Sequence, residues 1–192
     1  MVFYYPLEYT LMEITDSLET DIKDAPDWFH SAISQRPRKE NLNHPLGNVA
    51  YQVWDRKDAQ DIIILIHGTG AHKQWWDPIA PLLSNKFSII APDLPGMGES
   101  DHRNAYNFED FSDALISIFH QEKIVHGNQK VYLVGHSLGG HVAGFLASEF
   151  PDLFHGVVMI DSPIRPPTYD YDKHQSTGPL RRIKYYPDKV SI

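Results

Sequence analysis

The sequence predicts an α/β fold in which a mostly parallel sheet lies between helices in three layers. The main observation is that short apolar segments alternate along the chain with segments of helical periodicity. Strands and helices that alternate in this way connect through right-handed crossovers onto a parallel sheet. The second observation is that residues 62–66 (IIILI) are apolar without any polar alternation, which is typical of a strand buried on both faces.

Composition limits the class of protein. A chain of 192 residues with 42% hydrophobic and 22% charged residues fits one globular domain with a substantial core. The net charge of −8 argues against nucleic acid as a partner. The absence of cysteine excludes disulfide bonds, a thiolate nucleophile and a cysteine-ligated metal. No segment resembles a signal peptide or reaches the length of a membrane span, so we expect a cytoplasmic protein with no membrane partner.

Residues 1–37 are predicted to form a helical extension. Within it, acidic residues separate apolar residues that recur at helical spacing, namely Leu11, Ile14, Leu18 and Ile22. A second helix is expected between Pro26 and Pro37. Its buried face is predicted to comprise Trp28, Phe29 and Ile33. The acidic polar faces do not suit a membrane surface, where interfacial helices carry Lys and Arg.

Residues 38–163 are predicted to form the sheet domain. The expected strands are residues 38–42, 48–54, 62–66, 87–91, 131–134 and 157–160, of which the first two form a hairpin. Asp77 and Pro78 are expected to begin a helix as its N-cap and first-turn residue. The residues of that helix predicted to face inward are Ile79, Leu82 and Leu83. A second amphipathic helix is marked by Phe108, Phe111, Leu115, Ile118 and Phe119.

The stretch from Val131 to Phe150 carries the strongest functional signal. A short apolar run leads into Gly135-His136-Ser137-Leu138-Gly139, and small residues then recur as in a helix packed closely on a sheet. A serine at a sharp strand-to-helix turn needs a strained backbone, and side chains at the two glycine positions would clash with it. The pattern therefore favours Ser137 as a nucleophile. It also favours the N–H of Leu138, at the start of the helix, as a donor to a developing oxyanion.

In this context the sequence resembles the α/β-hydrolase family. Residues 62–66 followed by His67-Gly68-Thr69-Gly70 are similar to the family's third strand and oxyanion loop. Residues 91–100 (APDLPGMGES) are similar to the loop after its fourth strand. The resemblance covers roughly residues 38–163. It implies a sheet of the α/β-hydrolase type, a second oxyanion donor in the backbone N–H of Thr69, and no cofactor.

The serine also narrows the chemistry. The related epoxide hydrolases and haloalkane dehalogenases place an aspartate at the corresponding turn, whereas this chain has Ser137. Acyl transfer is therefore favoured, on esters, thioesters, lactones, amides or carbon–carbon bonds beside a ketone. We expect a small-molecule, ester-like substrate, whose identity the sequence does not give.

Residues beside these motifs are predicted to form the substrate pocket: His67, Gly68, His136, Trp75 and Trp76. The side chains among them have structural alternatives. His67 can support its loop, and His136 can be a partly buried, hydrogen-bonded side chain. One tryptophan can floor an acyl pocket while the other packs in the core. Further along the chain, the residues interpreted as turn residues that reach at most the rim of the pocket are Asp93, Gly96 and Gly98.

A serine nucleophile needs a general base within hydrogen-bond reach. The family order implies an acid and then a histidine after Ser137. His141 is expected to lie along the helix, and His155 at the opposite edge of the sheet. Asp161 and His174 remain as the candidate acid and base. The scattered histidines show no ligand spacing, so no metal site is expected.

Residues 164–192 are rich in proline and tyrosine and resemble the start of a lid. The family implies further strands that carry the acid and the histidine, so we expect a chain truncated after the sixth strand, with impaired activity. The alternatives are a non-catalytic binding protein of the same fold and a fragment completed by another chain. An unpaired sheet edge at residues 157–160 also predicts self-association.

Overall fold

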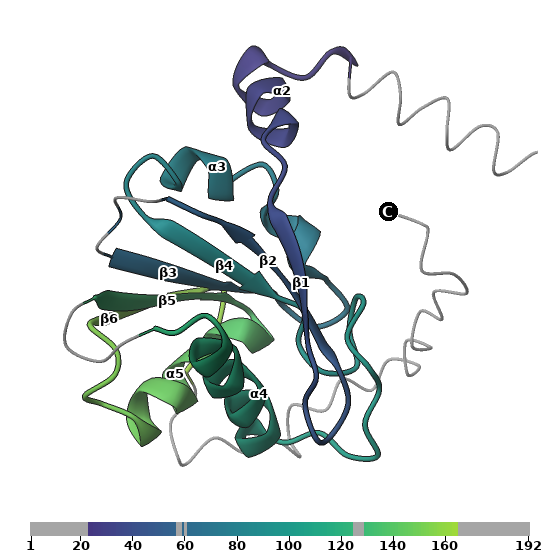
Figure 1. Cartoon of the computed structure of the whole chain (residues 1–192), viewed down its shortest axis with the longest axis vertical. Helices are drawn as coiled ribbons and strands as arrows, with labels where there is room; N and C mark the ends of the chain where they lie inside the picture. The colour runs from purple at the N-terminus through teal and green to yellow at the C-terminus, as the bar shows by residue number, and fades with distance from the viewer. Residues whose placement is uncertain (1–22, 57–58, 60, 125–128, 165–192) are drawn as a thin grey trace, which may run out of the picture.

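The computed structural model describes residues 23–56, 59, 61–124 and 129–164. Within them the chain forms a six-stranded sheet in the order β1-β2-β4-β3-β5-β6 (Figure 1). The strands are β1 (Arg38–Leu42), β2 (Val49–Trp54), β3 (Asp61–Ile66), β4 (Ser88–Pro92), β5 (Lys130–His136) and β6 (Gly156–Ile160). Strands β1 and β2 form an antiparallel hairpin, β2 is antiparallel to β4, and β4, β3, β5 and β6 run parallel.

The sheet confirms the predicted α/β class. Each predicted strand is present, and no strand end is shifted by more than two residues. In the parallel part, Ile64 of β3 pairs with Ile90 of β4 on one side and with Leu133 of β5 on the other. Strand β3 is therefore interior to the sheet, and its apolar sequence fits burial on both faces. Because parallel strands end at the same edge, the loops that follow β3, β4, β5 and β6 meet there.

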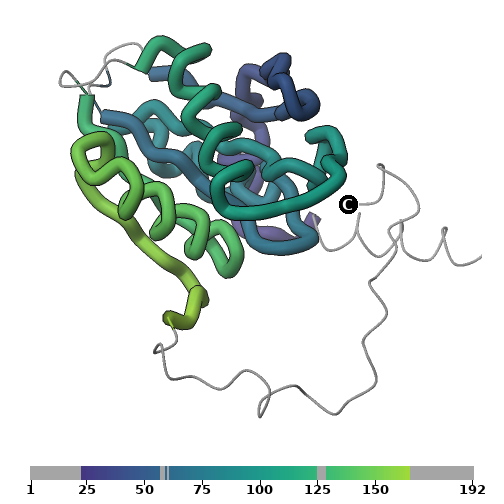
Figure 2. The backbone as a smooth tube through the Cα atoms, turned by 90° about the horizontal axis from the view of Figure 1, so that it is seen from below, coloured from purple at the N-terminus to yellow at the C-terminus, as the bar shows by residue number. Residues whose placement is uncertain are grey.

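Helices cover the two faces of the sheet unequally. Helices α4 (Phe108–Gln121) and α5 (Leu138–Glu149) lie together across one face, which Figure 2 shows from that side. The other face carries a short 3-10 turn, η1 (Lys73–Trp76), and a short helix, α3 (Ala80–Leu83). The larger core, under α4 and α5, includes Ile62, Ile64, Leu115, Leu133 and Leu146. The smaller core, under η1 and α3, is built around Ile63, Leu65 and Trp76.

Helix α4 shows how the sequence specifies one of these layers. Asn107 caps its start, because the side-chain oxygen accepts a hydrogen bond from the N–H of Asp110 at 2.7 Å. Burial of large apolar side chains contributes roughly 1.5–3 kcal/mol each. Phe108 is the exception in the predicted stripe, because it is largely exposed and stacks on Phe145 of α5. The rest of the stripe is buried as predicted, at Phe111, Leu115, Ile118 and Phe119.

The prediction for the helix after Trp76 is wrong in its start and in part of its buried face, since Leu83 does pack against the smaller core. Helix α3 begins at Ala80 with Ile79 as its N-cap, and it buries Ala80 and Pro81. Asp77 does not cap it, because its carboxylate accepts a hydrogen bond from Gln52 Nε2 at 2.6 Å. Leu82 and Ile79 are exposed. Residues 77–79 form a turn that follows the 3-10 turn at residues 73–76, so the helix begins later than predicted.

Helix α2 (Asp27–Ser34) is the described part of the predicted N-terminal extension. It starts one residue after the N-cap Pro26, and the residue that it buries is Ala32. The prediction that Trp28 is buried is wrong, since it is 49% exposed. The helix lies against α3 rather than on the sheet, and Trp54 Nε1 donates to the carbonyl of Gln35 just beyond it. The helix predicted between Leu11 and Ile22 lies outside the described residues.

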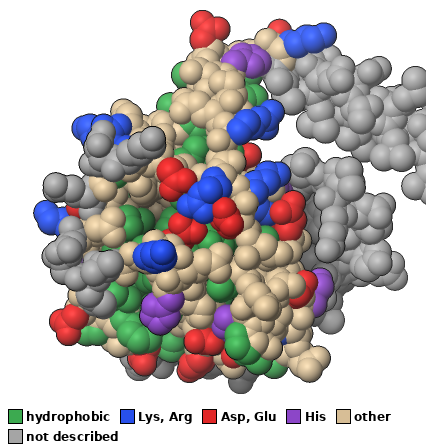
Figure 3. Space-filling view, in the orientation of Figure 1, with side chains coloured by type: hydrophobic (Ala, Val, Ile, Leu, Met, Phe, Trp, Pro, Cys, Tyr) green, Lys and Arg blue, Asp and Glu red, His purple; other side chains and the backbone are tan. Residues whose placement is uncertain are grey.

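The face that presents β1 carries interleaved basic and acidic side chains (Figure 3). Arg38 of β1 pairs there with Glu40, Asp55 and Glu122, each at 2.8 Å. Glu122 is the residue that follows α4, so these ion pairs connect the hairpin to that helix. None of the described helices is both long and apolar enough to cross a membrane.

Candidate active site

The turn between β5 and α5 holds Ser137 in a strained conformation. Its φ is 53° and its ψ is −116°, a region that costs a residue with a side chain on the order of 1–3 kcal/mol. Its N–H donates to the carbonyl of Ile160 at the end of β6, at 2.8 Å. Its carbonyl accepts hydrogen bonds from Ser162 Oγ at 2.8 Å and from the N–H of Gly140 at 3.1 Å. The surrounding backbone therefore holds the strained residue on both sides.

Close packing requires glycine at positions 135 and 139. A methyl group on Gly135 would collide with the backbone at Gly139. A methyl group on Gly139 would collide with the carbonyls of Ile66 and His67, at the end of β3. The clash predicted from the sequence is confirmed at both positions. The turn after β5 therefore lies directly against the end of β3.

The loop after β3 lies beside Ser137. A methyl group on Gly68 would lie 3.1 Å from Cβ of Ser137 and 2.9 Å from Nδ1 of His136. Thr69 is the next residue and is exposed. Among the backbone hydrogen bonds of the described residues, none is donated by the N–H of Thr69 or by that of Leu138. Two N–H groups without backbone acceptors therefore flank the serine from two different segments.

His67 lies in the interior, where both ring nitrogens bond to the backbone. Nδ1 donates to the carbonyl of Gly68 at 2.8 Å. Nε2 accepts a hydrogen bond from the N–H of Leu94, in the loop after β4, at 3.0 Å. Burial lowers the pKa of His67 below its ordinary value, so the ring is neutral, and its 4.0 Å contact with Asp93 Oδ1 is not an ion pair. These contacts fit the structural alternative for His67, in which the side chain supports its loop, rather than the prediction that it lines an open pocket.

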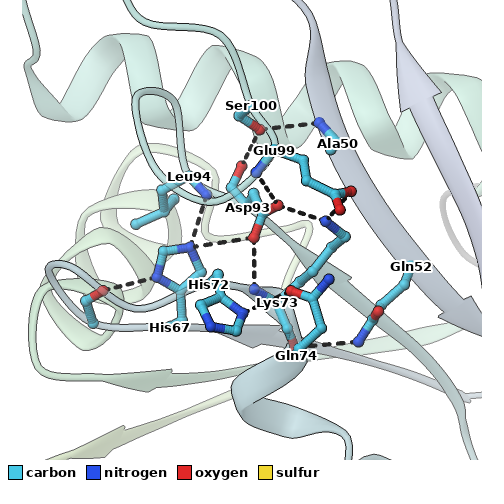
Figure 4. Close-up of polar contacts among 11 residues, drawn as sticks. Ala50, Gln52, His67, His72, Lys73, Gln74, Asp93, Leu94, Glu99 and Ser100 are labelled. Carbon is cyan, nitrogen blue, oxygen red and sulfur yellow. Dashed lines mark hydrogen bonds and ion pairs between the residues drawn. The ribbon is translucent and has the colours of Figure 1, made fainter. Parts of the chain in front are cut away.

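A buried ionic cluster next to this loop was not expected from the sequence. Lys73, at the start of η1, donates from its side chain to Asp93 and to Glu99, and both carboxylates belong to the segment after β4 (Figure 4). Asp93 is fully buried, although its sequence motif indicated only a turn residue. A signal was present, because Asp93 directly follows a buried strand. The distant lysine had no local pattern that could identify it.

The two tryptophans separate into different environments. Trp75 is 55% exposed and stacks on His136, with ring centroids 5.5 Å apart and an interplanar angle of 15°. Trp76 is buried in the smaller core. Nδ1 of His136 is buried, and among the described residues it has no hydrogen-bond partner. Trp75 thus contacts the residue before Ser137, whereas Trp76 is part of the core.

Comparison with known proteins decides what this arrangement belongs to. The family model described as alpha/beta hydrolase fold matches residues 61–180. The chain belongs to the α/β-hydrolase fold family. The matched range contains strands β3 to β6, the loop after β3 and the turn at Ser137.

Two of the relatives in sequence carry the words serine hydrolase in their names. A "Probable serine hydrolase" of Drosophila melanogaster is 33% identical over 151 residues, which cover 77% of this chain and 44% of that protein. A "Serine hydrolase-like protein" of Danio rerio is 30% identical over 120 residues, which cover 62% of this chain and 36% of that protein. Among solved structures, haloalkane dehalogenase DbeA from Bradyrhizobium elkani has a TM-score of 0.60 and 30% identity, over 68% of this chain and 43% of the other. The chain thus spans less than half the length of these relatives.

The pairing of Asp161 with His174 as candidate acid and base stays a prediction, because one of the two residues lies outside the described part of the chain. Asp161 is exposed at the end of β6, with a φ of 49°, and His174 lies outside the described residues. Nε2 of His141 lies 3.2 Å from the carbonyl of Pro163. His155 is at the far end of β6, beside Tyr132. Within the part of the chain that the structure describes, no group of three or more His, Asp or Glu residues could hold a metal ion.

Proposed function

We propose that this chain carries the nucleophile and the oxyanion-binding groups of a serine hydrolase that acts on small-molecule, ester-like substrates. The observation that carries the proposal is the strained Ser137, at a turn flanked by two N–H groups without backbone acceptors. In this reaction Ser137 Oγ attacks the acyl carbon, a base takes the hydroxyl proton, and the carbonyl oxygen becomes an oxyanion. The acyl-enzyme forms when the alcohol leaves, and water then releases the acid.

The identity of the side chain at the turn favours acyl chemistry over halide displacement. The chain is 30% identical to a haloalkane dehalogenase over the aligned part. Enzymes of that kind use an aspartate at the corresponding turn, as the family resemblance implies, and this chain has Ser137. A serine ester is opened by water at the acyl carbon. Esters and their close analogues are therefore the substrates that the residue suits.

The orientation of the Thr69 N–H supports its role as an oxyanion donor. A trans peptide unit is planar, so its C=O and N–H groups point in opposite directions. The carbonyl of Gly68 belongs to the same peptide unit, and it accepts hydrogen bonds from His67 Nδ1 at 2.8 Å and from the N–H of Ala71 at 3.2 Å. These bonds fix the carbonyl toward the interior. The Thr69 N–H therefore points away from the His67 ring.

The general base has two assignments within the proposal. His174, oriented by Asp161, follows the family order in this chain. Alternatively, the histidine and acid come from residues outside these 192, either in the same protein or in another chain. Under the second assignment the chain by itself turns over esters very slowly, since an oxyanion hole and binding without a triad retain only about 10³–10⁴-fold catalysis over water. Separately from the choice of base, the cytoplasmic location expected from the sequence stays a prediction.

The proposal is tested by a pair of serine variants in the whole protein. Ser137→Ala is expected to lower turnover of a short-chain nitrophenyl ester by several orders of magnitude, roughly 10⁶-fold where a complete triad operates. Ser148→Ala is the matched control, because Ser148 lies in α5 and, among the described residues, its hydroxyl donates to the carbonyl of Phe145 in the same helix. Equal turnover by the two variants would contradict the proposal. Ligand binding without turnover or labelling would favour the binding-protein alternative.

We also propose self-association through β6. In the described sheet β6 is an edge strand that pairs with β5, and Val158 and Ile160 on it are exposed. Edge strands with free backbone groups and apolar side chains invite pairing with a second copy. Light scattering of the 192-residue chain by itself is expected to show dimers or larger species. The measurement is made at about tens of micromolar, a concentration at which aggregation-prone species associate. A monodisperse monomer contradicts this proposal alone.

A further inference from the structure

Lys73 is a buried cation that the proposed reaction does not use. Its side chain is 1% exposed, and its ammonium donates to Asp93 Oδ2 at 2.6 Å and to Glu99 Oε2 at 2.7 Å. The hydrogen bond from Lys73 lowers the pKa of the Glu99 carboxyl, which keeps this partner ionised. Lysine is almost never buried to this degree unless its charge is paired. Its two carboxylate partners supply that pairing.

Asp93 connects this cation to the backbone of two loops (Figure 4). Oδ1 accepts a hydrogen bond from the backbone N–H of Lys73 at 2.6 Å, and Oδ2 accepts one from the backbone N–H of Glu99 at 2.8 Å. The N–H of Asp93 donates to the carbonyl of Ala50 in β2 at 2.8 Å. Ser100 Oγ accepts from the N–H of Ala50 and donates to the carbonyl of Asp93. The loop after β4 is thus fixed to the sheet, and Asp93 fixes Lys73 to that loop.

Stability alone does not account for a buried pair of this kind. The cost of taking two charges out of water offsets most of their attraction, so apolar replacements of similar volume are often neutral or stabilising. A charged pair does supply a fixed geometry. Here the two oxygens of Asp93 contact both the backbone and the side chain of Lys73, which sets the position and the direction of the chain at that residue.

Lys73 lies between two segments that approach the turn at Ser137. On its N-terminal side is the loop that carries Gly68, where an added methyl group would lie 3.1 Å from Cβ of Ser137, and then Thr69. On its C-terminal side, Trp75 stacks on His136, the residue before Ser137. His67 fixes the start of the loop through its bond to Leu94. Lys73 fixes its end, at the start of η1.

We propose that Lys73, held by Asp93, is a positioning residue that sets the Thr69 N–H beside Ser137 and the Trp75 ring against His136. The inference rests on the proposed function of Ser137 and adds the element that holds its oxyanion-binding loop in place. Lys73 touches no reacting atom in this account. It acts through seven residues of backbone, 67–73, whose two ends are both fixed to the loop after β4.

Lys73→Met in the whole protein tests the proposal by its effect on kcat. A shift of an oxyanion donor by about 1 Å costs on the order of 100-fold in rate, so kcat per folded molecule is expected to fall about 10- to 100-fold with KM little changed. Arg38→Met is the matched control, because it also removes a cation with several carboxylate partners, on a strand away from Ser137. Its kcat per folded molecule is expected to stay that of the unchanged protein. Folded fractions come from urea unfolding of each variant.

Amide hydrogen exchange gives a second readout that does not need catalysis. Lys73→Met is expected to speed exchange in residues 67–76 while residues 131–136 of β5 keep their protection, and Arg38→Met is expected to leave residues 67–76 unchanged. If the unchanged protein shows no Ser137-dependent turnover but the loop exchanges faster in Lys73→Met, the proposed function fails and the positioning of the loop stands. If turnover depends on Ser137 but neither kcat nor local exchange responds to Lys73→Met, the inference about Lys73 is overturned.

A milder variant covers the case in which Lys73→Met does not fold. Glu99→Gln removes the partner whose side chain is 55% exposed and leaves Asp93 and Lys73 in place. It is expected to lower kcat and to speed exchange of residues 67–76 in the same direction as Lys73→Met, by smaller factors. If Glu99→Gln changes neither kcat nor the exchange of residues 67–76, the proposal is overturned.

Discussion

Two neighbouring segments at the same edge of the sheet are held by different means. The turn at Ser137 is held by backbone hydrogen bonds and by glycines that permit close approach. The loop from His67 to Lys73 is held by buried side chains, one neutral imidazole and one ion pair, that bond to the segment after β4. The first segment is therefore expected to respond most to added atoms. The second is expected to respond most to changes in charge or protonation.

The largest effect is expected where the glycine turn is broken. Gly139→Ala places a methyl group against the carbonyls of Ile66 and His67, neither of which can move without shifting β3. The free energy of unfolding is expected to fall by about 3 kcal/mol or more. Urea unfolding at neutral pH measures this. A loss within about 0.5 kcal/mol, the range of neutral surface substitutions, would show that the turn is not closely packed.

Mild acid is expected to act on the other segment through His67. Burial lowers its folded-state pKa below the unfolded value of 6.5, so below pH 6.5 the unfolded chain binds a proton that the folded chain does not. Stability is therefore expected to fall as the pH drops from 6.5 toward the folded pKa, by up to about 1.4 kcal/mol per pH unit for this one group.

Nitrogen chemical shifts of the His67 ring check the cause directly. At pH 6 the ring is expected to be neutral, with the proton on Nδ1, because Nε2 accepts a hydrogen bond from Leu94. A ring that is already doubly protonated at pH 6.5 would contradict the assignment.

A smaller effect is expected from the side chain that supports the serine turn. Ser162→Ala removes the hydroxyl that donates to the carbonyl of Ser137, while the N–H of Gly140 remains bonded to that carbonyl. The cost is expected to be about 1 kcal/mol, measured by urea unfolding. A loss above about 3 kcal/mol, beyond a single neutral hydrogen bond, would show that the turn depends on this side chain more than on its backbone contacts.

The smallest effect is expected within the same helix, at a glycine that is not tightly packed. A methyl group on Gly144 would lie 3.6 Å from Met159 Sδ, which is ordinary contact. Gly144→Ala should therefore raise the free energy of unfolding by up to about 1 kcal/mol, the helix propensity gain. A destabilisation like that of Gly139→Ala would mean that α5 as a whole, rather than the turn, is the closely packed element.

The sequence predicted the elements whose determinants are local. The strands, helix α4 and the turn at Ser137 each depend on residues within one short segment, so periodicity and the glycine pattern were enough. The sequence prediction failed at Asp77, because its carboxylate accepts a hydrogen bond from Gln52 of β2 instead of capping a helix. It also missed Lys73, whose partners Asp93 and Glu99 are distant in the chain. Charged residues that pair only after folding have no periodic signal.

In the site, as in the fold, the sequence predicted the local motifs but not the contacts that form only after folding. Gly68 and Ser137 are in proximity, as the order of motifs indicated. The roles of His67 and of the two tryptophans could not be decided without the fold, because each depends on which side of the loop a side chain takes. The acid and base stay predictions, with Asp161 exposed and His174 outside the described residues.

The most direct test of the account is where a fluorophosphonate attaches to the whole protein. The reagent needs an activated serine beside an oxyanion hole. The account predicts a single adduct, mapped by peptide mass spectrometry to Ser137, that is lost in Ser137→Ala and retained in Ser148→Ala. An adduct on another serine, or equal labelling of the Ser137→Ala variant, would contradict the central claim that the strained turn presents the nucleophile.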